Sequence, residues 1–186
     1  KGAVMASNLL ALDLMAGLFE YPSSEYRERI AEVSAVVAQL NTAAAEQLKT
    51  FAHATGGCSL SEMEESYIRT FDLNPATCLD IGWHLFGEDY ARGEFLVKLR
   101  QEMRRYGIAE RDELPDSLLC VLPLVARMPE EEAVHFRAEF LLPAVEKIRK
   151  AVSEENNPFA ILLAALASLL AGNSTEEQLP GGRSDE

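Results

Sequence analysis

Apolar side chains recur every three or four residues along most of the chain, and glycine or proline interrupts them repeatedly. Tyr26, Ile30, Val33, Val37 and Leu40, for example, follow the 3.6-residue period of an α-helix. No segment alternates convincingly between apolar and polar residues, as a half-buried strand would. The pattern therefore predicts an all-α fold with a single compact domain of about eight to nine helices.

Local signals divide this pattern into elements. Ser7 can cap a first helix that runs to about Phe19, and Ser59-x-x-Glu62 and Ser61-x-x-Glu64 both match a capping box. Asp116 can cap a later helix, and Gly56-Gly57 is a helix stop. We expect nine helices in all. The second ends near residue 40, the third covers 43–54, and the fourth begins at 59–61. The fifth and sixth cover 76–86 and 89–106, and the last three begin near 116, 129 and 157.

The longest apolar run covers Pro158 to Ala171. A membrane-spanning helix needs roughly 20 such residues, so this run predicts a buried core helix and no direct membrane insertion. Gly172 should close it. We expect residues 1–172 to form the helical domain and the polar, acidic residues 173–186 to form a disordered tail.

The composition narrows the classes of partner. The formal net charge of −13 opposes binding to nucleic acid and to anionic membranes. The chain has three cysteines, an odd number, and no two of them form a C-x-x-C pair. This disfavours a disulfide framework. No signal peptide is visible, so we expect a cytoplasmic protein.

The residues that carry catalytic or metal chemistry lack the necessary spacing. His53, His84 and His135 belong to no H-E-x-x-H or E-x-x-H pattern, which a zinc site or a di-iron bundle would need. There is no G-x-S-x-G elbow and no glycine-rich phosphate loop. The sequence therefore predicts no enzyme activity, no metal and no cofactor.

The helix expected at 76–86 is apolar on two sides. Leu79, Trp83 and Phe86 share one face, and a second face carries Cys78, Ile81 and Leu85. Asp80 and His84 share the narrow polar edge between them, four residues apart. Such a helix is either central in the core or lines a groove for a partner peptide.

Two other functions stay open at this point. The helix expected at 89–106 is rich in arginine from Arg92 to Arg105, as the recognition helix of a DNA-binding regulator would be, although acidic neighbours largely offset this charge. A small helical enzyme would need a convergent acid–base pair, for which Asp80 and His84 are the local candidate.

The segment from Tyr67 to Glu88, YIRTFDLNPATCLDIGWHLFGE, resembles the delta-subunit family of respiratory nitrate reductases, within the redox-enzyme maturation chaperones. A following arginine-rich helix and the turn Glu113-Leu114-Pro115-Asp116 are also similar to that family. The resemblance implies a cytoplasmic chaperone that binds the N-terminal segment of the apo catalytic subunit of a molybdopterin oxidoreductase. It then assists molybdopterin insertion before the enzyme docks at the membrane.

The wider chaperone group has a histidine motif near this position, usually beside an aspartate and a proline. Here His84 lies between Trp83 and Leu85, so a nucleotide-binding role is not carried over. An apolar trough with a polar rim is what peptide capture requires. We expect the partner-peptide site to contain Tyr67, Phe71, Asp72, Trp83, His84, Phe86, Glu88 and Asp89.

Overall fold

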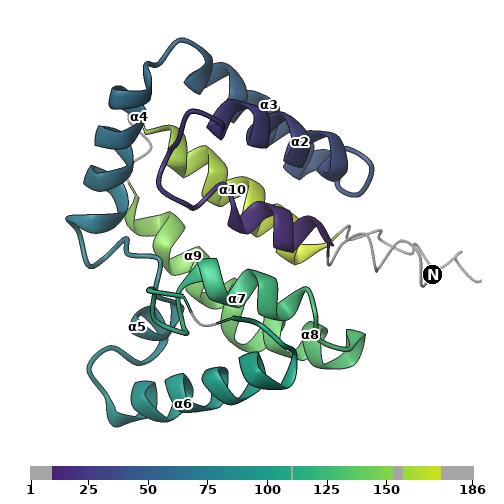
Figure 1. Cartoon of the computed structure of the whole chain (residues 1–186), viewed down its shortest axis with the longest axis vertical. Helices are drawn as coiled ribbons and strands as arrows, with labels where there is room; N and C mark the ends of the chain where they lie inside the picture. The colour runs from purple at the N-terminus through teal and green to yellow at the C-terminus, as the bar shows by residue number, and fades with distance from the viewer. Residues whose placement is uncertain (1–9, 110, 153–156, 173–186) are drawn as a thin grey trace, which may run out of the picture.

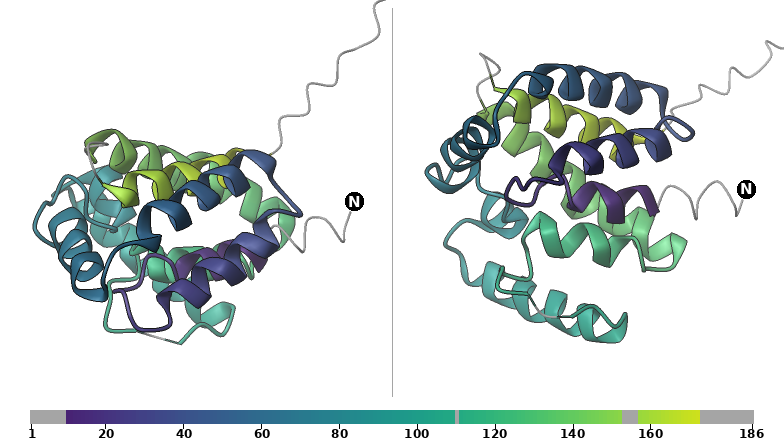
Figure 2. Two further views of the ribbon diagram at one scale, coloured as in Figure 1. Left: turned by 90° about the horizontal axis from the view of Figure 1, so that it is seen from above. Right: turned by 45° about the horizontal axis from the view of Figure 1, so that its top comes forward.

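The longest apolar run of the sequence forms α10 (Pro158–Ala171), which lies between α3 (Thr42–Gly56) and α9 (Leu142–Ala151) (Figures 1 and 2). The computed structural model describes residues 10–109, 111–152 and 157–172. Asn157 caps α10 by accepting a hydrogen bond from the Phe159 amide at 3.0 Å, and Gly172 ends the helix with a φ of 74°. Nine of its 14 residues are buried, which confirms the predicted core helix.

The all-α, single-domain expectation is confirmed. Among the described residues the only extended pairing is an isolated bridge between Asp80 and Ser117. None of the described helices is long and apolar enough to cross a membrane. The predicted helix cap at Ser7 and the predicted disordered tail at 173–186 lie outside the described residues.

The first described helix covers residues 10–16, and α2 (Tyr26–Val37) packs on α3. The predicted end of the first helix at Phe19 is too late. The amides of Gly17, Leu18 and Phe19 each bond the carbonyl three residues back, so the helix finishes in a tighter turn. This turn leads into the segment 20–24, which connects the first helix to α2.

The helix α4 (Leu60–Tyr67) begins at the predicted capping box. The Ser59 amide donates to Glu62 Oε2 at 2.7 Å, and the Glu62 amide donates to Ser59 Oγ at 3.3 Å. A widened turn, η1 (Ile68–Asp72), continues α4, with Leu73 N bonding Ile68 O at 3.0 Å. The hydroxyl of Thr77 donates to Thr70 O, so this turn is held by a side chain from the following loop.

The helix α5 (Ile81–Phe86) is shorter than the predicted helix at 76–86. The chain is not helical from 76 to 80 because Asp80 takes part in the bridge: Ile81 N donates to Asp116 O at 2.8 Å, and Leu118 N donates to Leu79 O at 2.9 Å. The two apolar faces predicted from helical spacing therefore do not extend to residues 78 and 79.

The remaining helices lie close to their predicted positions. They are α6 (Tyr90–Arg105), α7 (Leu118–Val125) and α8 (Glu130–Phe136), which a second widened turn, η2 (Arg137–Leu141), joins to α9. The cap of α7 is Ser117, not the predicted Asp116, whose side chain is buried in an ion pair described below. The helix α6 lies at the opposite end of the molecule from α3 (Figures 1 and 2).

Candidate binding site

Two overlapping pockets, of about 450 and 340 Å³, open beside α4 and η1. They share Tyr67, Asp72, Glu113 and Leu119, so they form one continuous hollow, which we call the furrow. Its other lining residues come from three separate segments and are Glu20, Tyr21, Phe71, Cys78, Leu79, Asp80, Arg111 and Ser117. The furrow is large enough to receive several side chains of another polypeptide.

The furrow rests on packed aromatic rings. The Tyr67 side chain is 6% exposed, and its hydroxyl donates to Phe19 O at 2.9 Å. The ring centroid of Phe71 lies 5.2 Å from that of Tyr67 and 5.1 Å from that of Phe159. These contacts tie η1 to α10 and fix the two predicted aromatic residues. They are thus core residues that also form the furrow surface.

The rim of the furrow is acidic. Glu20 is paired with Arg29 at 2.8 Å and with Arg111 at 3.1 Å. Asp72 and Glu113, in contrast, form no ion pair with any described residue. Two carboxylates are therefore available to a cation that enters the furrow, and the net charge of −13 supports its approach.

The acidic rim also perturbs its neighbours. Burial raises the pKa of the Tyr67 hydroxyl, and the charges of Asp72, Glu113 and Glu20 raise it further. Desolvation raises the pKa of Asp72 itself. The shift at Tyr67 indicates a negative field, and the desolvation of both groups indicates a partly dehydrated groove, where a pairing with a cationic group is stronger than in bulk water.

One wall of the furrow is held by a buried ion pair. The Arg92 guanidinium lies between two carboxylates, with Nε 3.0 Å from Asp116 Oδ2 and a terminal nitrogen 3.1 Å from Asp80 Oδ2. The Asp116 side chain is fully buried. Burial raises the pKa of Asp80, and the Asp116 carboxylate adds to the rise. This cluster, which we call the Arg92 clamp, fastens α6 to the Asp80–Ser117 bridge.

The predicted residues of α5 and its flank lie apart from the furrow lining. Trp83 is half-buried, and the guanidinium carbon of Arg92 lies over its ring, 5.7 Å from the ring centroid. Phe86 is half-buried, and its ring lies 5.3 Å from that of Phe95. Glu88 and Asp89 are exposed, and Asp89 caps α6 by accepting from Ala91 N at 2.8 Å. The eight predicted residues therefore fall into two groups.

Asp80 and His84, the candidate acid–base pair, bind different partners. His84 Nε2 lies 2.7 Å from the Cys78 carbonyl oxygen, whereas Asp80 binds Arg92. Burial lowers the pKa of His84 and raises the pKa of the Cys78 thiol, so both groups are driven toward their neutral forms. The described residues contain no cluster of three or more side chains suited to a metal ion.

The basic helix considered for DNA binding uses its arginines internally. Arg92 belongs to the clamp, and Arg105 pairs with Glu102 and Glu132, both at 3.2 Å. Arg100 and Arg104 also have interaction partners. A recognition helix needs arginines that can reach phosphates or bases, and this arrangement does not favour that function.

Several residues of the furrow were not predicted. Glu20, Tyr21, Arg111 and Leu119 come from segments far from Tyr67 in the sequence, and no local pattern identifies them. Glu113 had a signal, since it begins the Glu-Leu-Pro-Asp turn that resembles the delta-subunit family. Cys78, Leu79 and Asp80 also had one, since they belong to the segment that was expected to form a core or groove helix.

The described residues thus define an all-α protein with an open, acid-rimmed furrow. The family model for the nitrate reductase delta subunit matches residues 34–165, and the chain belongs to this family. It is 25% identical, over 174 residues, to the "Probable nitrate reductase molybdenum cofactor assembly chaperone NarJ" of Bacillus subtilis, with 92% of this chain and 94% of the relative covered. It is also 25% identical, over 165 residues, to the "Nitrate reductase molybdenum cofactor assembly chaperone NarJ" of Escherichia coli K12, with 87% and 70% covered.

Proposed function

We propose that this chain is a cytoplasmic, non-enzymatic assembly chaperone for a respiratory nitrate reductase or a related molybdenum oxidoreductase. It binds the cofactor-free catalytic subunit of the alpha type and assists molybdopterin insertion before membrane assembly. The observation that carries the proposal is the family match over residues 34–165, supported by two relatives that are named as nitrate reductase molybdenum cofactor assembly chaperones. Binding the cofactor-free conformation selectively would stabilise it by mass action, without chemistry from the chaperone.

The furrow is the proposed site for the N-terminal segment of that subunit. Tyr21, which is 47% exposed, offers aromatic surface beside the largely buried Tyr67, Phe71 and Leu119. Asp72 and Glu113 offer unpaired carboxylates. A segment that carries both an apolar and a basic side chain matches this combination. We include Trp83, His84, Phe86, Glu88 and Asp89 as a second, outer contact region, because their side chains are half-buried or exposed.

Co-purification tests the function directly. The tagged full-length chain should retain the nitrate reductase catalytic subunit from cells that cannot make molybdopterin, and retain much less of it from cells that can. Deletion of the gene that encodes this chain should leave the catalytic subunit present but depleted of molybdenum. Equal retention of the cofactor-free and cofactor-loaded subunits would contradict the proposed selectivity, and a fully loaded enzyme in the deletion strain would refute the chaperone role.

The furrow assignment has its own test. The double variant Asp72→Asn with Glu113→Gln should bind a synthetic peptide of the subunit's N-terminal segment about 5- to 30-fold more weakly, because each lost charge pair at a partly exposed site contributes roughly 0.5–1 kcal/mol. Isothermal titration calorimetry measures this. Glu28→Gln with Glu32→Gln is the matched control, since both residues are exposed on α2 and the change in net charge is equal. Equal loss in both double variants would show a general charge effect only.

A further inference from the structure

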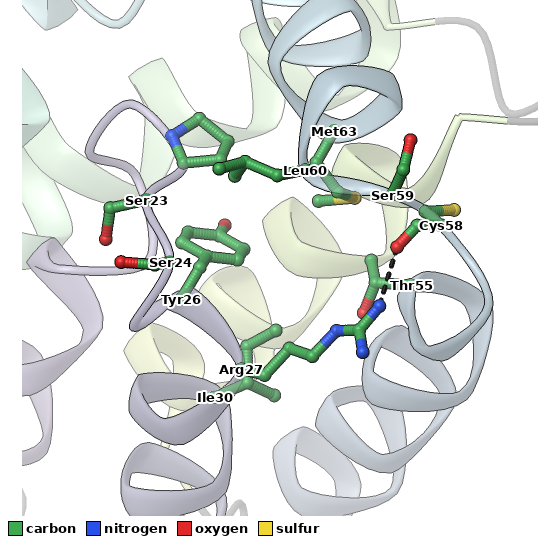
Figure 3. A pocket seen from close by; sticks show the side chains of 11 residues that line it. Ser23, Ser24, Tyr26, Arg27, Ile30, Thr55, Cys58, Ser59, Leu60 and Met63 are labelled. Carbon is green, nitrogen blue, oxygen red and sulfur yellow. Dashed lines mark hydrogen bonds between the residues drawn. The ribbon is translucent and has the colours of Figure 1, made fainter.

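A separate cavity of about 280 Å³ lies between the start of α2, the end of α3 and the start of α4 (Figure 3). Its inner walls include Tyr26, Ile30 and Met63, whose side chains are 3–5% exposed. Leu60 lies at its edge and is 42% exposed. We call this cavity the notch. A buried apolar wall beside an exposed apolar edge is suited to receive a side chain from outside.

The polar lining of the notch differs from that of the furrow. No aspartate or glutamate lines it, and its charged residue is Arg27. The Arg27 guanidinium donates to Cys58 O at 2.6 Å, a contact drawn in Figure 3, and so links α2 to the end of α3. A basic side chain gains no carboxylate here and would face a cation. The notch therefore selects a large uncharged, apolar side chain.

The notch and the furrow share two structural elements. Leu60, Met63 and Tyr67 follow one another on one face of α4, the first two lining the notch and the third lining the furrow. The rise of 1.5 Å per residue places Leu60 and Tyr67 about 10 Å apart along the helix axis. The connecting segment 20–24 contributes residues 20 and 21 to the furrow and residues 22–24 to the notch.

We infer that the notch is an anchor subsite for one large apolar side chain of the same partner segment whose basic part enters the furrow. This inference rests on the proposed function. The span of about 10 Å corresponds to three residues of an extended chain at about 3.3 Å each, or to seven residues of a helix. The partner segment should therefore place its apolar anchor about three positions from the residue that lies against Tyr67 if extended, and about seven if helical.

Methyl NMR on the full chain distinguishes this subsite from the furrow. The probe is a synthetic peptide that copies the N-terminal segment of the nitrate reductase catalytic subunit of the same organism. The methyl resonances of Met63 and Ile30 should shift on binding, together with that of Leu119 in the furrow. Replacing one apolar residue of the peptide by alanine should abolish the Met63 shift, preserve the Leu119 shift and weaken affinity about tenfold or more.

The outcomes separate the two proposals. Binding that shifts Leu119 but leaves Met63 and Ile30 unchanged overturns the notch and leaves the furrow assignment intact. An absence of binding overturns the proposed recognition of the N-terminal segment, and the notch inference falls with it. Shifts of Met63 that persist in every alanine-substituted peptide would also overturn the notch, because no single side chain would then occupy it.

A pair of variants tests the notch from the side of the chaperone. Leu60→Glu places a charge at the edge of the notch and should weaken peptide binding about tenfold. Ser61→Glu is the matched control, because Ser61 is the next residue of α4, is exposed and does not line the notch. An acid in the first turn of a helix is favourable, so both variants should fold, which circular dichroism checks. Equal affinities for the two variants would contradict the inference.

Discussion

Gly82 lies where a larger residue would collide with a buried carboxylate. An added Cβ would lie 2.5 Å from Asp116 Oδ2 and 3.2 Å from Phe95 Cδ1. The close approach lets the Asp116 carboxylate lie against α5 and bind Arg92 at the same time. At this position glycine is therefore required by space, although glycine inside a helix is intrinsically unfavourable. One residue without a side chain thus makes room for the Arg92 clamp.

Gly82→Ala should lower the free energy of unfolding by about 1–3 kcal/mol, because the new methyl group displaces the Asp116 carboxylate from a packed site. Gly93→Ala is the control: Gly93 is in α6, and a Cβ there meets no atom within 4 Å. That variant should gain up to about 1 kcal/mol from helix propensity. Urea denaturation measures both, and a stabilised Gly82→Ala variant would contradict the steric argument.

At the scale of elements, sequence signals predicted a helix boundary correctly where residues close in sequence form that boundary. The helix start predicted from the capping box at Ser59 and the one predicted near 157 are both confirmed. The start of α5 was predicted five residues too early, because the bridge of Asp80 with Ser117 joins residues 37 positions apart. The replacement of Asp116 by Ser117 as the cap of α7 has the same origin, since the ion pair with Arg92 is also nonlocal.

The cap of α10 performs two tasks that can be separated. Asn157 Oδ1 accepts from Phe159 N, and Asn157 Nδ2 donates to Thr70 Oγ1 at 2.9 Å, which connects α10 to η1. Asn157→Ala should lose both contacts and about 2 kcal/mol of stability. Asn157→Asp keeps the cap acceptor and should lose only about 1 kcal/mol. Thermal and urea unfolding measure the difference, and equal losses would show that the cap does not contribute.

At the scale of the whole molecule, the candidate site depends on tertiary structure. Tyr67, Phe71 and Asp72 were predicted together because they are close in sequence, and they do meet in the furrow. Glu20 and Arg111 reach the same hollow from 91 positions apart, and the sequence contains no pattern that joins them. Sequence reasoning therefore identified one side of the furrow, and only the fold brings the other sides to it.

The net charge of −13 acts on the molecule as a whole. Association with a basic partner segment should be accelerated at low ionic strength, because the long-range field guides encounter before contact. Raising the salt from about 0.02 to 0.5 M should slow association about tenfold, with a smaller change in the dissociation rate. Stopped-flow fluorescence with a labelled peptide measures both rates. A salt effect confined to dissociation would show that the charge acts only through short-range pairs.

The central position of α10 has a consequence for biosynthesis. Translation delivers residues 158–171 after every other described helix, yet α3 and α9 pack against them. On the nascent chain, the apolar sides of α3 and α9 that face α10 stay uncovered until α10 has been synthesised and has left the ribosome. The core around α10 can therefore be completed only after this segment is available, and the uncovered apolar sides of α3 and α9 favour aggregation until then.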